Sequence, residues 1–321
     1  MRHVAFFALL MTLAAVHAAA AQSASWPDRP IHLIVPFPAG SSSDIVARIV
    51  AQKLGERLGQ QLVVENRPGA SGNLGTEAVA HAAADGYTLG LANTSTLTLS
   101  PSLMAKPAYD PVKDFMPISM IGASPFVLAL YPDVPATNVQ ELVALPKTKP
   151  LTFASAGPAT LANLAGVLFA KTAHIELTPV SYRGSGQEIL DVVAGRIDMA
   201  FATIPPTLPL IRDGKVRAIA VTGPQRSPAL AEVPTVAESG LPDYESVLWQ
   251  ALYAPAGTPA PIVMRLNAEV NAILHDGDTV GALAKLGVEA QPSTPQQLAG
   301  RIAADLKKWH DVIVSAGIQP Q

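Results

Sequence analysis

Short apolar runs alternate along the chain with longer segments in which apolar side chains recur every three or four residues. The run Ile31–Val35 predicts a buried strand. It leads into a turn rich in proline and glycine, after which Ser41 to Asp44 can cap a helix. That helix is indicated by six apolar residues at helical spacing, namely Ile45, Val46, Ile49, Val50, Leu54 and Leu58. This order of strand, turn and helix is typical of proteins with a largely parallel sheet.

The alternation continues in two sets of predicted elements. In the first set, strands are predicted at 61–64 and 88–91, and a helix that Asn73 caps runs through Ala83. The second set comprises strand 152–154, helix 161–171, strand 177–182, helix 188–194, and strands 197–201 and 216–221. We expect this second set to form a sheet of its own. Near the end of the chain, Thr294 and Gln297 have the spacing of a capping box, which predicts a helix over Pro295–Ser315.

Two extended apolar segments, 116–131 and 245–254, lie between these sets and predict a paired hinge. The expected fold is therefore α/β, with two Rossmann-like lobes joined by two strands. Lobe one is predicted to comprise residues 26–122 and 247–321, and lobe two residues 123–246. A single continuous doubly wound sheet is the alternative. In open α/β sheets ligands bind at the carboxyl ends of strands, so two such edges would face one cleft.

Composition narrows the functional classes. The chain has 321 residues, of which 49% are hydrophobic and 15% charged, which is too apolar for a disordered protein. Its 22 Lys and Arg against 25 Asp and Glu argue against a nucleic-acid partner or a polybasic membrane patch. Cysteine is absent, which excludes disulfides and thiolate nucleophiles, and the histidines lack metal-ligand spacing. We predict no metal site and no cofactor.

The amino-terminal residues 1–21 have the pattern of a secretory signal peptide. Arg2 precedes an apolar stretch of thirteen residues, and small residues end at Ala21. The stretch is too short to cross a bilayer, and a lipid anchor would need a cysteine. We expect cleavage after Ala21 and release into a bacterial periplasm without a lipid anchor. An uncleaved amphipathic amino terminus is the alternative.

Catalytic motifs are not evident, and no catalytic residue is predicted. The serine cluster Ser41 to Ser43 follows a strand, but no base can be assigned to it from the sequence. Small and hydroxyl residues recur after strands, at 37–44, 155–160, 183–186 and 94–96. The first N–H groups of a helix have no internal partners, so such turns can bind an anion with backbone donors. The pattern predicts carboxylate capture, with ordinary strand-to-helix turns as the alternative.

A series of motifs in order resembles the Bug (TctC-like) family of substrate-binding proteins. The motifs are Trp26–Pro30, Val35–Gly40 with Asp44, Val64–Asn73, Asp85–Leu89, Tyr109–Phe115, Tyr182–Ser185, Ala220–Thr222 with Arg226–Leu230, Val233–Glu238 and Ala254–Pro259. The resemblance implies a two-lobed type II periplasmic binding protein fold that closes on a small carboxylate. It further implies a role in tripartite tricarboxylate transporters, with their membrane subunits as partners, and neither catalysis nor a cofactor. We expect a monomer.

The resemblance also implies a set of ligand-binding residues. The first loop falls on Phe37, Pro38, Ala39, Gly40, Ser41 and Asp44, and the second on Gly157, Ala159 and Thr160, with Arg183 and Gly184 nearby and Thr203 at the end of the next strand. Thr94 is a further candidate from the pattern of hydroxyl residues after strands alone. Two positions depart from the family pattern, because Ser41 stands where glycine is common and Asn163 where histidine is frequent. Asp44 is predicted either to cap the helix or to accept a ligand hydrogen bond. Arg183 is predicted either to border the pocket or to be a solvated loop residue.

The sequence therefore predicts a periplasmic solute receptor that is not an enzyme. Two other functions stay open at this point. One is a ligand sensor that docks onto a signalling receptor, which would use the same binding chemistry. The other is a periplasmic hydrolase that uses the cluster Ser41 to Ser43.

Overall fold

The computed structural model describes residues 26–145, 151–155, 160–182, 187–315 and 318–320. The predicted signal peptide lies outside these residues. The elements of the first part of the chain are β1 (Ile31–Val35), α2 (Ser42–Leu58), β2 (Leu62–Asn66), η1 (Ala70–Gly72), α3 (Asn73–Ala80), β3 (Thr88–Asn93), η2 (Ser95–Leu99) and α4 (Ser100–Leu103). A long strand, β4 (Phe115–Leu130), then leads away from them.

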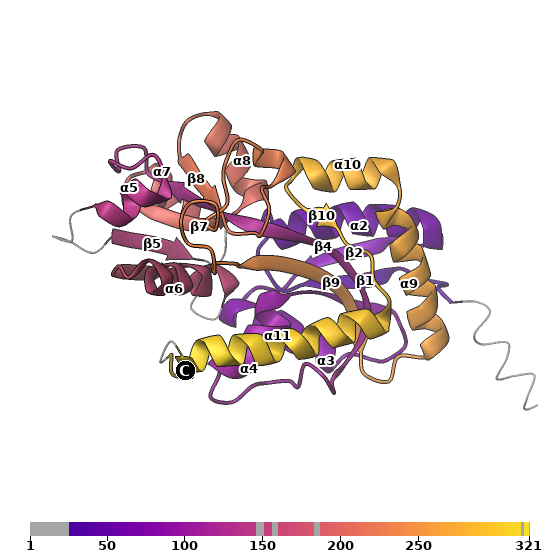
Figure 1. Cartoon of the computed structure of the whole chain (residues 1–321). Helices are drawn as coiled ribbons and strands as arrows, with labels where there is room; N and C mark the ends of the chain where they lie inside the picture. The colour runs from indigo at the N-terminus through magenta and orange to yellow at the C-terminus, as the bar shows by residue number, and fades with distance from the viewer. Residues whose placement is uncertain (1–25, 146–150, 156–159, 183–186, 316–317, 321) are drawn as a thin grey trace, which may run out of the picture.

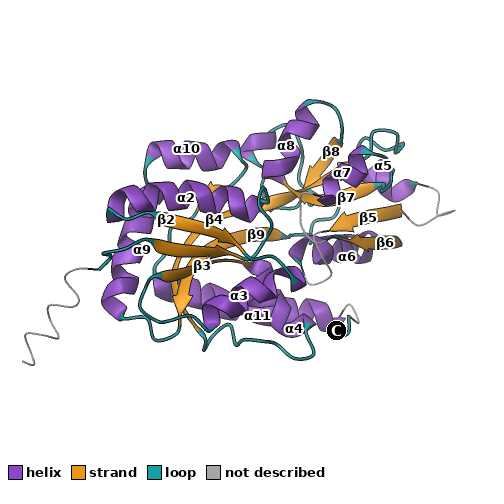
Figure 2. Ribbon diagram, turned by 180° about the vertical axis from the view of Figure 1, so that it is seen from behind, coloured by secondary structure: helices purple, strands orange, loops and turns teal. Residues whose placement is uncertain are grey.

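The second part of the chain repeats the alternation. Its elements are α5 (Val139–Ala144), β5 (Leu151–Ser155), α6 (Leu161–Ala173), β6 (Leu177–Ser181), α7 (Gln187–Val193), β7 (Met199–Thr203), α8 (Ile204–Arg212), β8 (Arg217–Val221) and η3 (Pro228–Leu230). The chain returns through β9 (Val247–Pro255), α9 (Ala260–Leu274), α10 (Gly277–Lys285), β10 (Glu289–Ala290) and α11 (Pro295–Ser315). Figures 1 and 2 show the two groups of strands side by side, with helices on both faces of each.

The two groups of strands have the same order. In the first, the order is β2-β1-β3-β9-β4, where β1 is parallel to β2 and β3, and β9 is antiparallel to β3 and β4. In the second, β5 is parallel to β6 and β7, while β4 is antiparallel to both β7 and β8. Each group thus has parallel strands, one antiparallel returning strand and a further strand beyond it, and in the first group β10 also pairs with β4. The predicted two-lobed α/β architecture is confirmed.

Strand β4 belongs to both groups, which corrects the prediction of a separate second sheet. Its residues 115–125 pair with β9, and its residues 126–130 pair with β7 and β8. Helices cover both faces of a strand in such an arrangement, and β4 is accordingly apolar along most of its length. The second connection precedes β9, where the Ser246 N–H donates to the Thr222 carbonyl at 2.8 Å. The lobe boundaries at 122/123 and 246/247 stay a prediction. Strand β4 continues across the boundary at 122/123.

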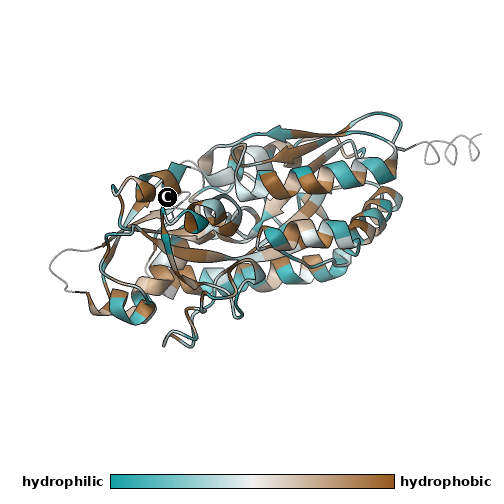
Figure 3. Cartoon of the chain, turned by 90° about the horizontal axis from the view of Figure 1, so that it is seen from above, coloured by the Kyte–Doolittle hydropathy of each residue, from teal (hydrophilic) through white to brown (hydrophobic). Residues whose placement is uncertain are grey.

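Buried apolar clusters lie on the faces of the strands, and one of them joins residues of both lobes. In lobe one, Leu33, Leu89 and Leu252 lie in one cluster with the apolar face of α2 and α9. Phe153 and Phe201 of lobe two lie in a second cluster on the side of α6, which also contains Leu103 of α4 and Trp309 of α11. Figure 3 shows the strands mostly in the hydrophobic colour, with hydrophilic colour on the outer sides of the helices. Removal of this apolar surface from water holds each lobe together.

The predicted end of the chain is confirmed in detail. Helix α11 spans Pro295–Ser315, as the capping-box spacing predicts. The Gln297 N–H donates to Thr294 Oγ1 at 3.1 Å, and the Thr294 N–H donates to Gln297 Oε1 at 2.8 Å. The prediction for Asn73 is wrong: Gly72 caps α3, which ends at Ala80, while the Asn73 amide donates to the Ala70 carbonyl at 2.6 Å.

Candidate functional site

A small cavity lies where the strand ends of the two lobes meet. From lobe one it is lined by residues at the start of α2 and at the end of β3. From lobe two it is lined by residues at the start of α6, in α7 and at the end of β7. The lining residues are Phe37, Ser41, Ser42, Ser43, Asn93, Ser95, Phe126, Thr160, Ala162, Glu188, Thr203 and Leu248.

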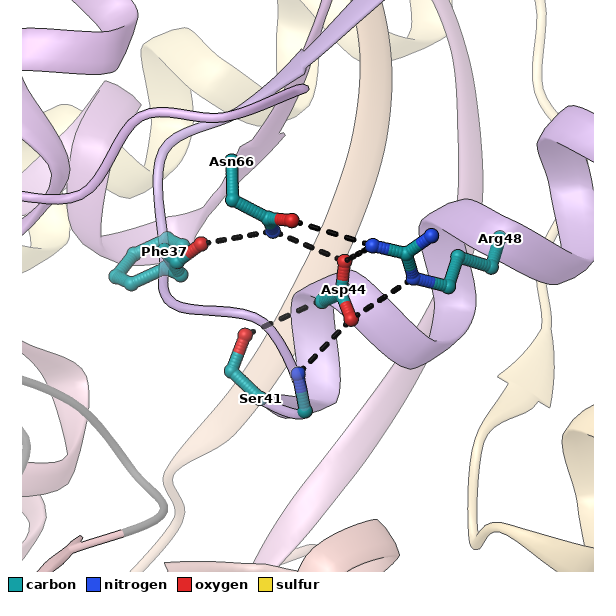
Figure 4. Close-up of polar contacts among 6 residues, drawn as sticks. Phe37, Ser41, Asp44, Arg48 and Asn66 are labelled. Atoms are coloured by element: carbon teal, nitrogen blue, oxygen red, sulfur yellow. Dashed lines mark hydrogen bonds and ion pairs between the residues drawn. The ribbon is translucent and has the colours of Figure 1, made fainter. Parts of the chain in front are cut away.

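A hydrogen-bond network around the buried Asp44 fixes the turn between β1 and α2 (Figure 4). Asp44 Oδ2 accepts hydrogen bonds from the Gly40 N–H at 2.9 Å and from Arg48 Nε at 3.0 Å. Its Oδ1 accepts one from Asn66 Nδ2 at 2.9 Å and forms an ion pair with Arg48 Nη2 at 3.0 Å. Asn66 Nδ2 also donates to the Phe37 carbonyl at 3.0 Å. These bonds set the position of Phe37 and of the first turn of α2 in the cavity.

The negative charge of Asp44 strengthens the hydrogen bonds that hold this turn. Burial opposes its ionisation, but hydrogen bonds from Arg48, Gly40 and Asn66 outweigh burial and hold the pKa of Asp44 below its ordinary value. Both carboxylate oxygens are occupied by donors of the turn and its neighbours, and Asp44 is not among the lining residues. The N-cap is Ser41, whose Oγ accepts from the Asp44 N–H at 3.3 Å. The Asp44 carboxylate therefore stabilises the turn before α2 and does not cap the helix, and a ligand contact of Asp44 stays a prediction.

Lobe one presents hydroxyl groups and helix N–H groups to the cavity. Ser42 and Ser43 lie in the first turn of α2, where backbone N–H groups lack carbonyl partners within the helix. Ser42 Oγ accepts a hydrogen bond from Gln250 Nε2 at 3.4 Å. The dipole of α2, a helix of 17 residues, adds positive potential at this end. This wall can therefore hold an anionic group.

The two lobes touch directly beside the cavity. Asn93 Oδ1 accepts hydrogen bonds from the N–H groups of Ser95 at 3.0 Å and Thr96 at 3.2 Å, which fixes the turn after β3. Ser95 Oγ in turn accepts a hydrogen bond from the Leu161 N–H at 2.9 Å. Leu161 is the first residue of α6, so a side chain of lobe one accepts a hydrogen bond from the amino-terminal end of a helix of lobe two. The structure therefore represents a form in which the two walls are in contact.

Lobe two presents the starts of two helices. Thr160 is the N-cap of α6 and accepts the Asn163 N–H at 3.4 Å, and Ala162 lies in the first turn. Thr203 is the N-cap residue of α8, and its hydroxyl has no hydrogen-bond partner among the described residues. Backbone donors of α6 thus face those of α2 across the cavity.

Glu188 is the one carboxyl group among the described lining residues. It lies in the first turn of α7 and is 0% exposed. Neither of its carboxyl oxygens has a hydrogen-bond partner in the described part of the chain. Burial raises the pKa of Glu188 to about 8, so the protonated form predominates at neutral pH.

The structure brings four of the predicted site residues together in the cavity: Phe37, Ser41, Thr160 and Thr203. Others lie outside the lining: Pro38, Ala39 and Gly40 belong to the turn before α2, and Thr94 accepts the Trp249 N–H at 3.0 Å to join β3 to β9. Gly157, Ala159, Arg183 and Gly184 lie outside the described residues. A ligand contact of any of these residues stays a prediction.

Sequence reasoning missed eight lining residues, which are Ser42, Ser43, Asn93, Ser95, Phe126, Ala162, Glu188 and Leu248. The serines could have been predicted, because they lie in the turns 37–44 and 94–96, which the sequence analysis identified as candidate binding turns. Phe126 and Leu248 lie on β4 and β9, where both strands read as buried hinge segments. Glu188 gives no local signal, since an acidic residue in the first turn of a helix is usually solvated.

The described part of the chain offers little for catalysis or metal binding. The lining residues include three adjacent serines, but none of the described lining residues is a histidine or a lysine. Within the same residues, no three side chains of His, Asp or Glu gather as metal ligands would. No helix of the described segments is long and apolar enough to span a bilayer.

Comparison with known proteins gives a consistent result. The model of the tripartite tricarboxylate transporter family receptor matches residues 46–318. The solved periplasmic binding protein BugD is 32% identical, with a TM-score of 0.87, and the match covers 92% of this chain and 100% of BugD.

Two further solved structures contain carboxylates. Rpa4515 of Rhodopseudomonas palustris with adipate is 34% identical, with a TM-score of 0.89, over 92% of this chain and 100% of that protein. MatC of the same organism with bound malate is 33% identical, with a TM-score of 0.84, over 90% of this chain and 100% of MatC.

Proposed function

The chain belongs to the tripartite tricarboxylate transporter receptor family of periplasmic solute-binding proteins, and we propose that it captures a small carboxylate between its two lobes. A family of solute-binding proteins is not an enzyme class. The captured ligand would be delivered to the membrane subunits of a tripartite tricarboxylate transporter. We further propose export through cleavage after Ala21 and action as a monomer in the periplasm.

One observation carries this proposal: a single cavity has helix starts of both lobes in its walls. The first turns of α2 and α6 contribute Ser42, Ser43 and Ala162 to the lining. Each helix start can contribute roughly 0.3 to 2 kcal/mol to holding an anion, depending on its burial. Adipate and malate, which two related solved structures hold, are small carboxylates.

The contact between the lobes explains how binding can be reported to a transporter. A ligand favours a closed form only by its higher affinity for that form. Donors from both walls meet a single ligand only when the lobes are together, as they are where the Leu161 N–H donates to Ser95 Oγ. The closed surface is then the form that a membrane partner would recognise.

Ligand binding is tested by thermal unfolding of the mature protein with mono-, di- and tricarboxylates. A ligand that binds the native protein should raise the melting temperature with the logarithm of its concentration. The result that would refute carboxylate capture is the absence of any shift at millimolar concentrations across the panel.

A matched pair of variants ties binding to this cavity. Thr203 and Thr207 are both buried, and the hydroxyl of each has no partner in the described part of the chain, but Thr203 alone lines the cavity. Thr203→Val should weaken carboxylate binding by about tenfold, as expected for a lost hydrogen bond to a charged group. Thr207→Val should leave it unchanged. Equal affinities for the two variants would place the ligand elsewhere.

Delivery to a transporter needs its own experiment. The membrane subunits of a tripartite tricarboxylate transporter from the same genome are reconstituted in proteoliposomes with a labelled ligand. Uptake should depend on added mature protein. Ligand binding without any stimulation of uptake would remove the transporter partner from the proposal and favour a sensory role.

A further inference from the structure

We propose that Glu188 selects the ligand, and that the cavity takes an amino carboxylate, whose cationic ammonium group meets Glu188 while its carboxylate meets the helix starts. The inference rests on the proposed function, since it concerns the same cavity. It assigns a specificity role to a side chain that no motif of the family marks.

The placement of Glu188 calls for a partner. A buried polar group is almost always hydrogen-bonded, and burial of an unpaired carboxylate carries a large cost. Glu188 is completely buried and lines the cavity, and both its oxygens lack partners among the described residues. An ammonium group supplies three N–H donors and a compensating charge, which is what these oxygens lack.

The charges of the lining argue against a ligand with two carboxylates. Apart from Glu188, the described lining residues bear hydroxyl, amide or apolar side chains. A dicarboxylate would therefore bring three carboxyl groups into one small cavity with no cationic side chain among the described lining residues. Like charges this close disfavour ionisation of one another. A ligand with one carboxylate and one ammonium leaves the same cavity with paired charges.

The surroundings of Glu188 offer few competing titratable groups. Helix α7 packs on β5 and β7, and neither strand contains a titratable residue. The near neighbours that titrate are Tyr182, whose hydroxyl donates to Asp191 at 2.6 Å, and Asp191 itself, which pairs with Arg196 at 2.7 Å. On the opposite wall, Asp44 is occupied by Arg48 and Asn66. These pairs are already formed, so none of these groups among the described residues competes with a ligand for Glu188.

The test compares ligands matched in length. Isothermal titration of the mature protein at pH 7 measures affinities for adipate, 6-aminohexanoate and hexanoate, and for succinate, 4-aminobutanoate and butanoate. The amino carboxylate should bind most tightly in at least one series. Its binding should also release close to one proton, measured in buffers of different ionisation enthalpy, because pairing ionises a carboxyl that is largely protonated without ligand.

The variant Glu188→Gln separates the two ligand classes. Glutamine keeps the size of the side chain and removes its charge, so affinity for the amino carboxylate should fall by at least about tenfold. Affinity for the dicarboxylate should stay the same or rise, because the amide N–H can donate to a carboxylate. Proton release should disappear.

The possible outcomes separate this inference from the proposed function. Tighter binding of dicarboxylates than of amino carboxylates by the wild-type protein would overturn the inference and leave carboxylate capture intact. The wild-type ranking does not depend on whether any variant folds. Failure of every carboxylate in both series would overturn the proposed function itself.

Discussion

The buried carboxyl of Glu188 makes the stability of the ligand-free protein depend on pH in a direction that can be worked out. Its pKa rises from an ordinary value of 4.5 to about 8 in the folded protein, through burial. Between these values the folded protein keeps a proton that the unfolded chain has released. The free energy of unfolding therefore falls as the pH rises. The cost is absent below the unfolded pKa and complete above the folded one.

The size of the effect follows from the shift. Each pH unit between the two pKa values changes the free energy of unfolding by about 1.4 kcal/mol. Glu188 should therefore lower the stability of the wild-type protein by about 2 to 3 kcal/mol on going from pH 5 to pH 7. Glutamine does not titrate, so its burial costs the same at every pH. Carboxyls with lowered pKa, such as Asp44 and Glu65, contribute equally to both proteins and cancel in the comparison.

Urea unfolding of the ligand-free protein, followed by circular dichroism, measures this difference. The stability of Glu188→Gln relative to the wild type should rise steadily from pH 5 to pH 7 and level off above about pH 8. Tyr182, whose pKa burial raises to about 12, does not titrate in this range. A difference that stays constant across the series would mean that Glu188 keeps the same protonation state in the folded and unfolded chains, and would refute the reasoning.

Three other substitutions probe the geometry of the site. Ser95→Ala removes the acceptor of the hydrogen bond from the first turn of α6. Ligand affinity should then fall by about tenfold, because the closed form is destabilised. Calorimetry measures this affinity, and Ser227→Ala, at a buried serine outside the cavity, is the control. Asp44→Asn should lower the free energy of unfolding by about 1 to 3 kcal/mol at neutral pH. This loss should shrink as the pH falls below 3.8, the ordinary pKa of an aspartate, because the wild-type carboxylate then becomes protonated as well. Urea unfolding at pH 7 and pH 3 measures the difference. Asn93→Ala removes the acceptor for two N–H groups after β3, so it should lower both the melting temperature and the ligand affinity, and an effect on affinity alone would contradict a positioning role.

The architecture was largely predictable because its signals are local. Strand β1 was predicted with its observed ends, and α11 with its capping box, from residues within a few positions of each other. The helix Ala260–Leu274 went unpredicted although its buried residues recur at helical spacing. The sharing of β4 between the two groups of strands could not be predicted from the sequence, because its pairing with β7, β8 and β9 involves residues about seventy or more positions away.

The site was predictable to the level of its loops. Turns after strands predicted where helix starts would face the cavity, and Phe37, Ser41, Thr160 and Thr203 lie there. The orientation of single side chains was not predictable from these turns. Thr94 lies beside two lining residues but bonds to Trp249, because β9 supplies an N–H at that position. Such partners come from distant parts of the chain, which motif spacing does not reveal.

Glu188 links stability and selectivity through one placement. The same burial that costs stability in the ligand-free protein puts in the cavity an acceptor without a partner among the described residues, and a ligand of opposite charge gains most from pairing with it. Selection for binding can retain such a residue, since a protein needs only to stay above a threshold of stability. At pH 7, replacing Glu188 by glutamine should therefore raise the stability of the ligand-free protein above that of the wild type. The same substitution should reduce the stabilisation that an amino carboxylate gives. If the role of Glu188 were only structural, the substitution would lower both quantities.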